Sequence, residues 1–220
     1  TQARPWWEHR AFLALLVVCA GAPLWLPQIP PLTDLPGHMG RYAVQLSAGT
    51  ASTLSQWYAF DWHWIGNLGV DLVVQLLGPW MGVEVATKAV VIAIPMLTAA
   101  GFLTVAREVH GRVPPTAFLA LPLAYNYAFN WGFVNFALSM ALAFLAFALW
   151  LRLAKAGRLR LRAVLFALLS LTLWTAHIFG WAMLCVLAFS AELVRQWDCG
   201  RRWLALLATA AVNCLPLLPP

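Results

Sequence analysis

Three ionisable residues at helical spacing open a polar stretch in a chain that otherwise avoids charge. Asp34, His38 and Arg41 lie in the segment IPPLTDLPGHMGRYAVQ, and in a helix over about 36–48 they share one stripe with Gln45. A carboxylate can serve as a base or a metal ligand, and a guanidinium can bind an anionic group through two parallel hydrogen bonds. The spacing therefore predicts a site with Asp34 as base or metal ligand and with His38 and Arg41 binding an anion.

Each of these candidates also has a structural interpretation. Asp34 precedes Pro36 at the mouth of the expected helix, where Asp is a common cap. The motif DWHW places Asp61 and His63 among tryptophans, and a solvated pair beside interfacial Trp anchors is the alternative to a binding role. His177 follows a long apolar run, and an ionisable residue at the membrane edge is a functional candidate, with a structural hydrogen bond to an outer-loop carbonyl as the alternative.

The composition is that of a membrane protein. Of the 220 residues, 62% are hydrophobic and only 10% are charged, against about 25% charged in a soluble domain. The 13 Trp agree with this, because indole rings favour the membrane–water boundary. The net charge of +6 comes from short basic clusters between apolar runs, so nucleic-acid binding is not expected. The four cysteines are widely spaced, which supports neither a zinc site nor a disulfide framework.

The predicted fold is all-α: a polytopic bundle of about seven transmembrane helices, with amphipathic surface helices in the first outer loop. A spanning helix needs roughly 20 apolar residues, and the segments that fit are 11–27, 83–106, 115–131, 132–152, 163–179, 180–196 and 203–218. Residues 66–80 are too short, and Asn67, Asp71 and Gln75 form one stripe, which predicts a helix on or dipping into the membrane surface. We expect one domain over 1–220, with 28–82 as the long outer loop.

The basic residues predict an orientation. With a cytoplasmic N-terminus, most Lys and Arg fall in loops on the inner side, as the positive-inside rule requires. The candidate site residues then lie on the outer side, where Asn130 and Asn135 are expected to cap or bridge a turn. The excess of Arg over Lys suits a GC-rich genome, which is compatible with a bacterial inner membrane as the location. The first residue, Thr1, and the apolar ending CLPLLPP predict that the chain is part of a longer polypeptide, truncated at the C-terminus.

Several longer motifs resemble the GT-C superfamily of polyprenyl-phosphate-sugar-dependent glycosyltransferases. They are DLPGH in the first outer loop, LLGPWMGVEVATK, YNYAFNWGFVNFALSMALAF and TAHIFG. The resemblance implies an integral membrane enzyme that transfers a sugar from a lipid-phosphate donor on the outer face. Asp34 is at the position of the family's catalytic or metal-linked carboxylate and would accept a proton. We expect His38, Arg41 and His177 to stabilise the departing phosphate. Family members are usually longer and have more spans.

Other functions stay open from the sequence. The chain could be a non-catalytic accessory or scaffold subunit of a larger membrane complex, so enzymatic activity is not decided at this stage. A transporter fits less well, because transporters place ionisable groups near the membrane midplane. The expected partners are membrane lipid, a lipid-linked sugar donor and other membrane subunits. A divalent metal stays open, because Asp34 and Asp61 alone do not define a coordination shell.

Overall fold

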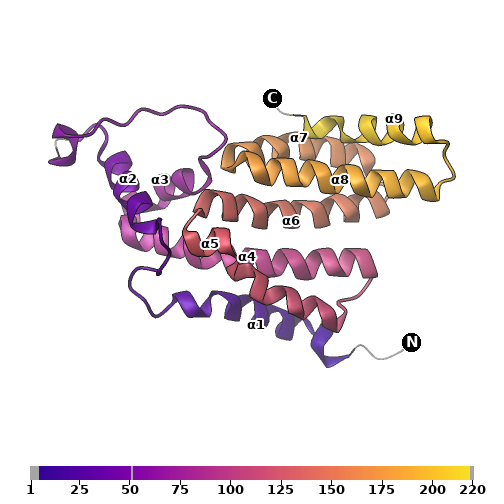
Figure 1. Cartoon of the computed structure of the whole chain (residues 1–220), viewed down its shortest axis with the longest axis horizontal. Coiled ribbons are helices and arrows are strands. Elements are labelled where there is room, and N and C mark those ends of the chain that lie inside the picture. Colours follow the sequence, from indigo (N-terminus) through magenta and orange to yellow (C-terminus); the bar gives the residue numbers. More distant parts are fainter. Residues whose placement is uncertain (1–4, 51, 219–220) are drawn as a thin grey trace.

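The computed structural model describes residues 5–50 and 52–218. Within these residues the chain is all-helical and contains no β-strand, as the composition predicts (Figure 1). Short 3₁₀ segments join the α-helices. The α-helices are α1 (Arg10–Gly21), α2 (Leu35–Ser47), α3 (Gly69–Met81), α4 (Val83–His110), α5 (Tyr127–Trp131), α6 (Val134–Lys155), α7 (Leu159–Ala176), α8 (Ile178–Asp198) and α9 (Trp203–Cys214).

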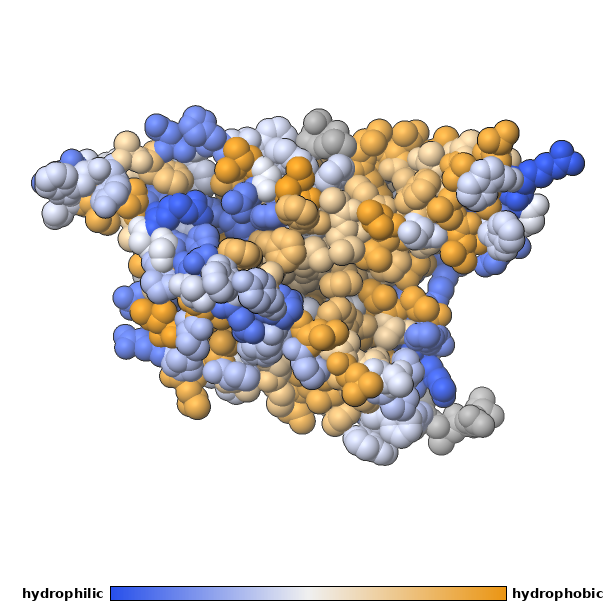
Figure 2. All heavy atoms as spheres, viewed as in Figure 1, coloured by the Kyte–Doolittle hydropathy of each residue, from blue (hydrophilic) through white to orange (hydrophobic). Residues whose placement is uncertain are grey.

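Four helices, α4, α6, α7 and α8, are long and apolar enough to cross a membrane. They coincide with four of the seven expected spans, those at 83–106, 132–152, 163–179 and 180–196. The segments Arg10–Leu24, Gly69–Met81 and Trp203–Leu217 are apolar but shorter. Figure 2 shows hydrophobic side chains over much of the bundle and hydrophilic ones at its two ends, one of which carries α2 and α3. The structure thus supports a helical protein with four candidate spans.

The segment 115–131 differs from the expected single helix. It forms a 3₁₀ stretch over Pro115–Tyr125 and then the short helix α5. Prolines at 114, 115 and 122 explain the difference, because proline lacks an N–H donor and restricts the residue before it. The phenol of Tyr125 donates a 2.6 Å hydrogen bond to the Ala20 carbonyl, which fixes this stretch beside α1.

Helices α4 and α6 form the centre of the bundle. Helices α1 and α3 pack on α4, while α8 packs on α6 and is covered by α7 and α9. At the crossing of α6 and α8, a Cβ added to Gly180 would lie 2.5 Å from the Ser139 hydroxyl, so the two helices approach too closely for any larger residue. The consecutive helices α6, α7 and α8 are antiparallel neighbours (Figure 1), which brings the α7–α8 junction next to the start of α6.

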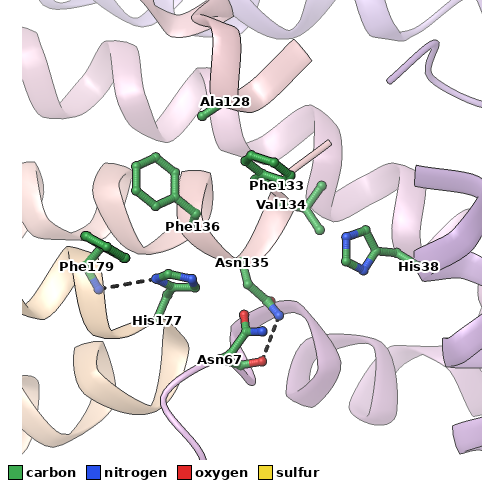
Figure 3. A pocket seen from close by; sticks show the side chains of 9 residues that line it. All are labelled: His38, Asn67, Ala128, Phe133, Val134, Asn135, Phe136, His177 and Phe179. Atoms are coloured by element: carbon green, nitrogen blue, oxygen red, sulfur yellow. Dashed lines mark hydrogen bonds between the residues drawn. The ribbon is translucent and has the colours of Figure 1, made fainter. Parts of the chain in front are cut away.

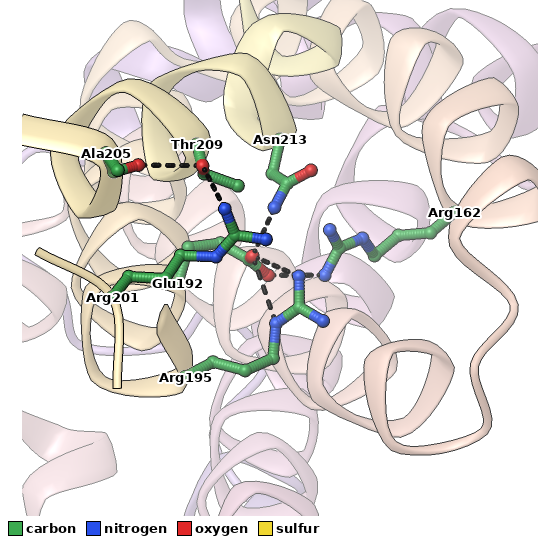
Figure 4. A network of polar contacts seen from close by, with 7 residues as sticks. All are labelled: Arg162, Glu192, Arg195, Arg201, Ala205, Thr209 and Asn213. Carbon is green, nitrogen blue, oxygen red and sulfur yellow. Dashed lines mark hydrogen bonds and ion pairs between the residues drawn. The ribbon is translucent and has the colours of Figure 1, made fainter. Parts of the chain in front are cut away.

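A buried ion pair lies near one end of the bundle (Figure 4). Arg162 on α7 donates a 2.6 Å bond to Glu192 on α8, and both side chains are at most 3% exposed. The second Glu192 oxygen accepts bonds from Arg195 and from Asn213 of α9. The guanidinium of Arg162 also lies 3.8 Å from the Trp150 ring centroid. Arg162, expected in an exposed basic turn, is therefore a buried residue that joins four helices.

The basic residues nevertheless gather at this same end. The last turns of α4, α6 and α8 carry Arg107 and His110, Arg152 and Lys155, and Arg195 respectively. Helices α2 and α3, predicted over 36–48 and 66–80, lie at the other end, with bounds shifted by at most three residues at either terminus. The candidate site residues are carried by this second end.

Candidate functional site

The polar stripe of α3 lies along the contact with α2, with Asp71 buried and Gln75 exposed at its edge. Asp71 is fully buried and forms an ion pair with Arg41 of α2. On the next turn Gln75 accepts a 2.9 Å hydrogen bond from Gln45, whose amide also donates to the Asp71 carbonyl. The exposed side of α3 carries large apolar residues instead, Leu72, Leu76 and Trp80 among them. The stripe is therefore the packing surface between α2 and α3.

Asn135 at the start of α6 holds this packing in place. Its side-chain oxygen accepts a 2.6 Å bond from the Val70 amide, and its nitrogen donates 2.9 Å bonds to the Asn67 carbonyl and to the Asp71 carboxylate. The expectation that Asn135 caps or bridges its own turn was wrong, because all three of these partners belong to α3 or to Asn67, two residues before it. Asn130 does stay within the turn, where it donates to the Tyr125 carbonyl at 2.7 Å.

Asp34 stands at the N-cap of α2, yet its side chain makes no capping hydrogen bond. Its backbone amide donates to the Trp131 carbonyl at 2.9 Å, which joins α2 to the α5–α6 turn. Gly132 permits this approach: it has φ +98°, and a Cβ there would lie 2.8 Å from the Asp34 nitrogen. The carboxylate is half-buried and lies one helical turn before His38, whose amide bonds to the Asp34 carbonyl at 3.1 Å.

A pocket of about 440 Å³ brings His38 and His177 together (Figure 3). We call it the histidine pocket. His38 comes from α2 and His177 from the α7–α8 junction, and Figure 3 shows them on opposite sides of the cavity. Asn67 and Asn135 add polar groups. The remaining lining is apolar: Ala128, Phe133, Val134, Phe136 and Phe179.

His177 is held in one orientation. Its Nδ1 accepts a 3.2 Å hydrogen bond from the Phe179 amide, so the side chain caps α8. Rings of Phe136 and Phe179 contact the imidazole, the first edge-on and the second stacked. Because Nδ1 is an acceptor, the neutral ring carries its proton on Nε2. The predicted alternative, a bond to an outer-loop carbonyl, is not the contact the structure shows.

Both imidazoles favour the neutral form. Burial lowers the pKa of His38 below its usual 6.5, and the charge of Arg41 lowers it further, while Asp71 and Asp34 oppose the shift. Burial also lowers the pKa of His177. Near neutral pH both rings are therefore uncharged, and each has one nitrogen that donates a hydrogen bond and one that accepts. Neutralisation of a phosphate by two imidazolium charges would need a lower pH.

Arg41 does not line the histidine pocket. Together with Asp61 it lines a second cavity of about 670 Å³, between α2 and the loop 54–61. His63 is exposed, and it lines neither of these two cavities. In the DWHW motif, Trp64 donates a 3.0 Å bond to the Thr175 hydroxyl and packs edge-on against Trp174, which anchors the loop to α7.

The described residues offer a divalent metal few ligands. Nowhere among residues 5–50 and 52–218 do three or more His, Cys, Asp or Glu side chains come together as a possible metal site. Calcium and magnesium prefer about six or more oxygen ligands. Asp34 therefore belongs to no such group of side chains within this part of the chain.

The buried partners Gln45, Asp71 and Asn135 were missing from the predicted site. The four-residue spacing of Asn67, Asp71 and Gln75 was the signal that could have identified an internal polar face. The same pattern fits a wet surface helix, and only the position of α2 separates the two. The chain matches no protein-family model, no curated protein and no solved structure, so its function is inferred from the geometry.

Proposed function

We propose that this chain forms the membrane part of a GT-C-like glycosyltransferase, which transfers a sugar from a lipid-phosphate donor on the outer face of a bacterial inner membrane. The observation that carries the proposal is the histidine pocket. It is a cavity of about 440 Å³ with a mainly apolar lining, two imidazoles and two amides, at one end of an apolar bundle. Such a lining suits a ligand with an apolar body and a polar head group.

The proposed transfer assigns roles to three side chains. His38 and His177 line the histidine pocket, and Asp34 lies outside its lining, one helical turn before His38. An acceptor hydroxyl forms a bond to the anomeric carbon of the sugar, and the bond from that carbon to the phosphate oxygen breaks. The lipid phosphate leaves with the electron pair, and Asp34 takes the hydroxyl proton. Nε2–H of His177 donates to a phosphate oxygen as charge develops there, and His38 binds from the opposite side.

The arrangement of charge supports the proposed orientation. The basic last turns of α4, α6 and α8 lie at the end of the bundle opposite the histidine pocket. With the positive-inside rule this makes the pocket end the outer side and the N-terminus cytoplasmic. In the proposed seven-span topology, Arg10–Leu24, 115–131 and Trp203–Leu217 complete the four longer spans. Arg10–Leu24 and Trp203–Leu217 reach about 22 Å each at the rise of an α-helix, and 115–131 crosses as the 3₁₀ stretch Pro115–Tyr125 followed by α5. Local bilayer thinning accommodates such short spans.

A donor-consumption assay tests the proposal. The purified chain in lipid nanodiscs is given a radiolabelled polyprenyl-phosphate hexose, and release of polyprenyl phosphate is followed with and without a membrane extract as the source of acceptor. We expect Asp34→Asn and His177→Ala to lower the rate at least 100-fold, a typical contribution of an acid–base or oxyanion-stabilising group. Asp198→Asn and His110→Gln are matched controls, since both are exposed residues at the opposite end.

The outcome decides between the two functions that the sequence left open. Donor consumption that requires Asp34 and His177 supports the transferase. Equal rates for Asp34→Asn, His177→Ala and the controls would refute the assigned roles. No consumption by any variant, with the chain bound stably to other membrane proteins from its host, would support the accessory subunit instead.

A further inference from the structure

Two glycines on the exposed side of α2 are not explained by packing. Gly37 and Gly40 are one turn apart in the helix interior, where glycine is less favourable than alanine. A Cβ added at either position would meet no atom within 4 Å, and both residues have negative φ. Neither a close helix contact nor a special backbone angle therefore requires glycine here. Because the two glycines have no side chain, the backbone of α2 itself lines a cavity at these positions.

That cavity, which we call the α2–loop pocket, is the one of about 670 Å³ that also contains Arg41 and Asp61. The loop over it carries aromatic side chains. Tyr58 is 61% exposed, so its ring is free to cover a ligand, and Phe60 is held edge-on against Trp62 at 5.0 Å. The glycine backbone forms one wall of the pocket and the aromatic residues contribute to the other.

The charges favour a neutral ligand over an anion. Arg41 is already paired with the buried carboxylate of Asp71, although 41% of its side chain stays exposed. Asp61 adds a second carboxylate to the lining. One guanidinium and two carboxylates sum to a net charge of −1, which disfavours phosphate. The guanidinium still offers N–H donors and Asp61 offers acceptor oxygens, the complement that neutral hydroxyl groups need.

We propose that the α2–loop pocket binds a neutral saccharide, with its hydroxyl groups on Arg41 and Asp61 and an apolar ring face on Tyr58 and Phe60. This assignment rests on the proposed function in one respect: it makes the saccharide the acceptor of the transferred sugar. The acceptor then binds beside Arg41 of α2, while the donor binds in the histidine pocket beside His38 of the same helix. Saccharide binding itself needs no catalysis, so it can be tested separately.

The test is saturation-transfer NMR on the chain in nanodiscs, with methyl glycosides of glucose, galactose and mannose as probes and empty nanodiscs as the blank. We expect saturable transfer to at least one glycoside. Gly40→Leu projects a side chain into the pocket from a position where an added Cβ meets no atom within 4 Å, and we expect at least tenfold weaker binding from it. Asp61→Asn keeps the shape of the pocket and should also weaken binding. Ala208→Leu adds the same side chain at an exposed position of α9 and should bind as the wild type does.

Each result either supports or overturns the proposal. Loss of binding in Gly40→Leu and Asp61→Asn, with Ala208→Leu unchanged, supports it. No saturable binding by the wild type overturns it, as does unchanged binding in both pocket variants, or displacement of the glycoside by inorganic phosphate at equal concentration. If glycosides bind but donor is not consumed, the proposed function fails and the saccharide pocket stands. If donor is consumed and Gly40→Leu leaves the KM for the acceptor unchanged, the pocket assignment fails and the transferase stands.

Discussion

Asn135 offers the sharpest test of how the site is built, because one amide joins α6 to α3. Replacing it by alanine leaves the Val70 amide without an acceptor, and Val70 is fully buried. It also removes one of the bonds to the Asp71 carboxylate, which is equally buried. An unsatisfied buried amide costs about 1–3 kcal/mol, and a lost bond to a charged group about 1.5–3 kcal/mol. Asn67 is exposed, so water replaces the bond to its carbonyl. We expect Asn135→Ala to lower the free energy of unfolding by about 3–5 kcal/mol.

Reversible unfolding in mixed dodecyl maltoside and SDS micelles measures this change. Asn130→Ala is the matched control, since Asn130 is exposed and makes one local bond to the Tyr125 carbonyl. It should cost about 1 kcal/mol or less. A second variant, Asn135→Asp, places a carboxylate against Asp71. The two carboxylates repel each other while both are ionised, so this variant should gain stability as the pH falls from about 7 to 5 and the pair takes up a proton.

The reasoning would be refuted if Asn135→Ala and Asn130→Ala were equally destabilised. That result would mean that water or another donor satisfies Val70 and Asp71 once the amide is gone. The ion pair between Arg41 and Asp71 would then suffice to hold α2 against α3. The histidine pocket would not depend on Asn135 for its shape.

Two further predictions concern the buried charges and the pocket. Arg162→Met removes one partner of the buried Glu192 carboxylate and should lower the free energy of unfolding by about 3–5 kcal/mol. The double variant with Glu192→Met should be much closer in stability to the wild type, because an apolar pair can replace a buried ion pair. Additive losses in a double-mutant cycle would contradict this. His38 has a lowered pKa when folded, so the unfolded state binds more protons and stability should fall as the pH drops below 6.5. His38→Gln should flatten this decline in pH-dependent unfolding curves, and a curve identical to that of the wild type would show that other groups cause it.

The two amphipathic helices could be predicted because their periodicity reports which residues share a face. The spacing of Leu35, Met39, Tyr42 and Leu46 predicts one apolar stripe of α2, and the first three are buried while Leu46 is partly buried. The helical periodicity does not say which other part of the molecule, or water, contacts each face. The helix that carries the polar stripe with Asp71 was expected on or dipping into the membrane surface, which stays a prediction, and the structure adds that Asp71 and Gln75 of this stripe contact α2. In an apolar chain, a polar face can be satisfied by water or by another polar face, and the pattern is the same for both.

The predicted site residues show the same limit. Asp34, His38 and Arg41 share a stripe in sequence, but the structure places His38 in the histidine pocket and Arg41 in the α2–loop pocket, while Asp34 lines neither. His177 joins His38 because Gly66 and Leu68 bond to the α7–α8 junction: the Gly66 carbonyl accepts from the Ile178 amide at 3.0 Å, and the Leu68 amide donates to the Thr175 carbonyl at 2.8 Å. These contacts are irregular backbone bonds, which leave no pattern in the sequence.

The sequence by itself determined that the chain is helical and apolar enough for several membrane spans, because those properties depend on composition and on a local period of 3.6 residues. It also identified His38 and His177 as unusual, since ionisable groups are expensive beside apolar runs. Only the tertiary structure decided that these two residues share a pocket, that Arg162 is buried against Glu192, and that Arg41 is paired with Asp71. Those outcomes depend on contacts between segments far apart in the chain, and no local pattern specifies which distant partner will satisfy a charge.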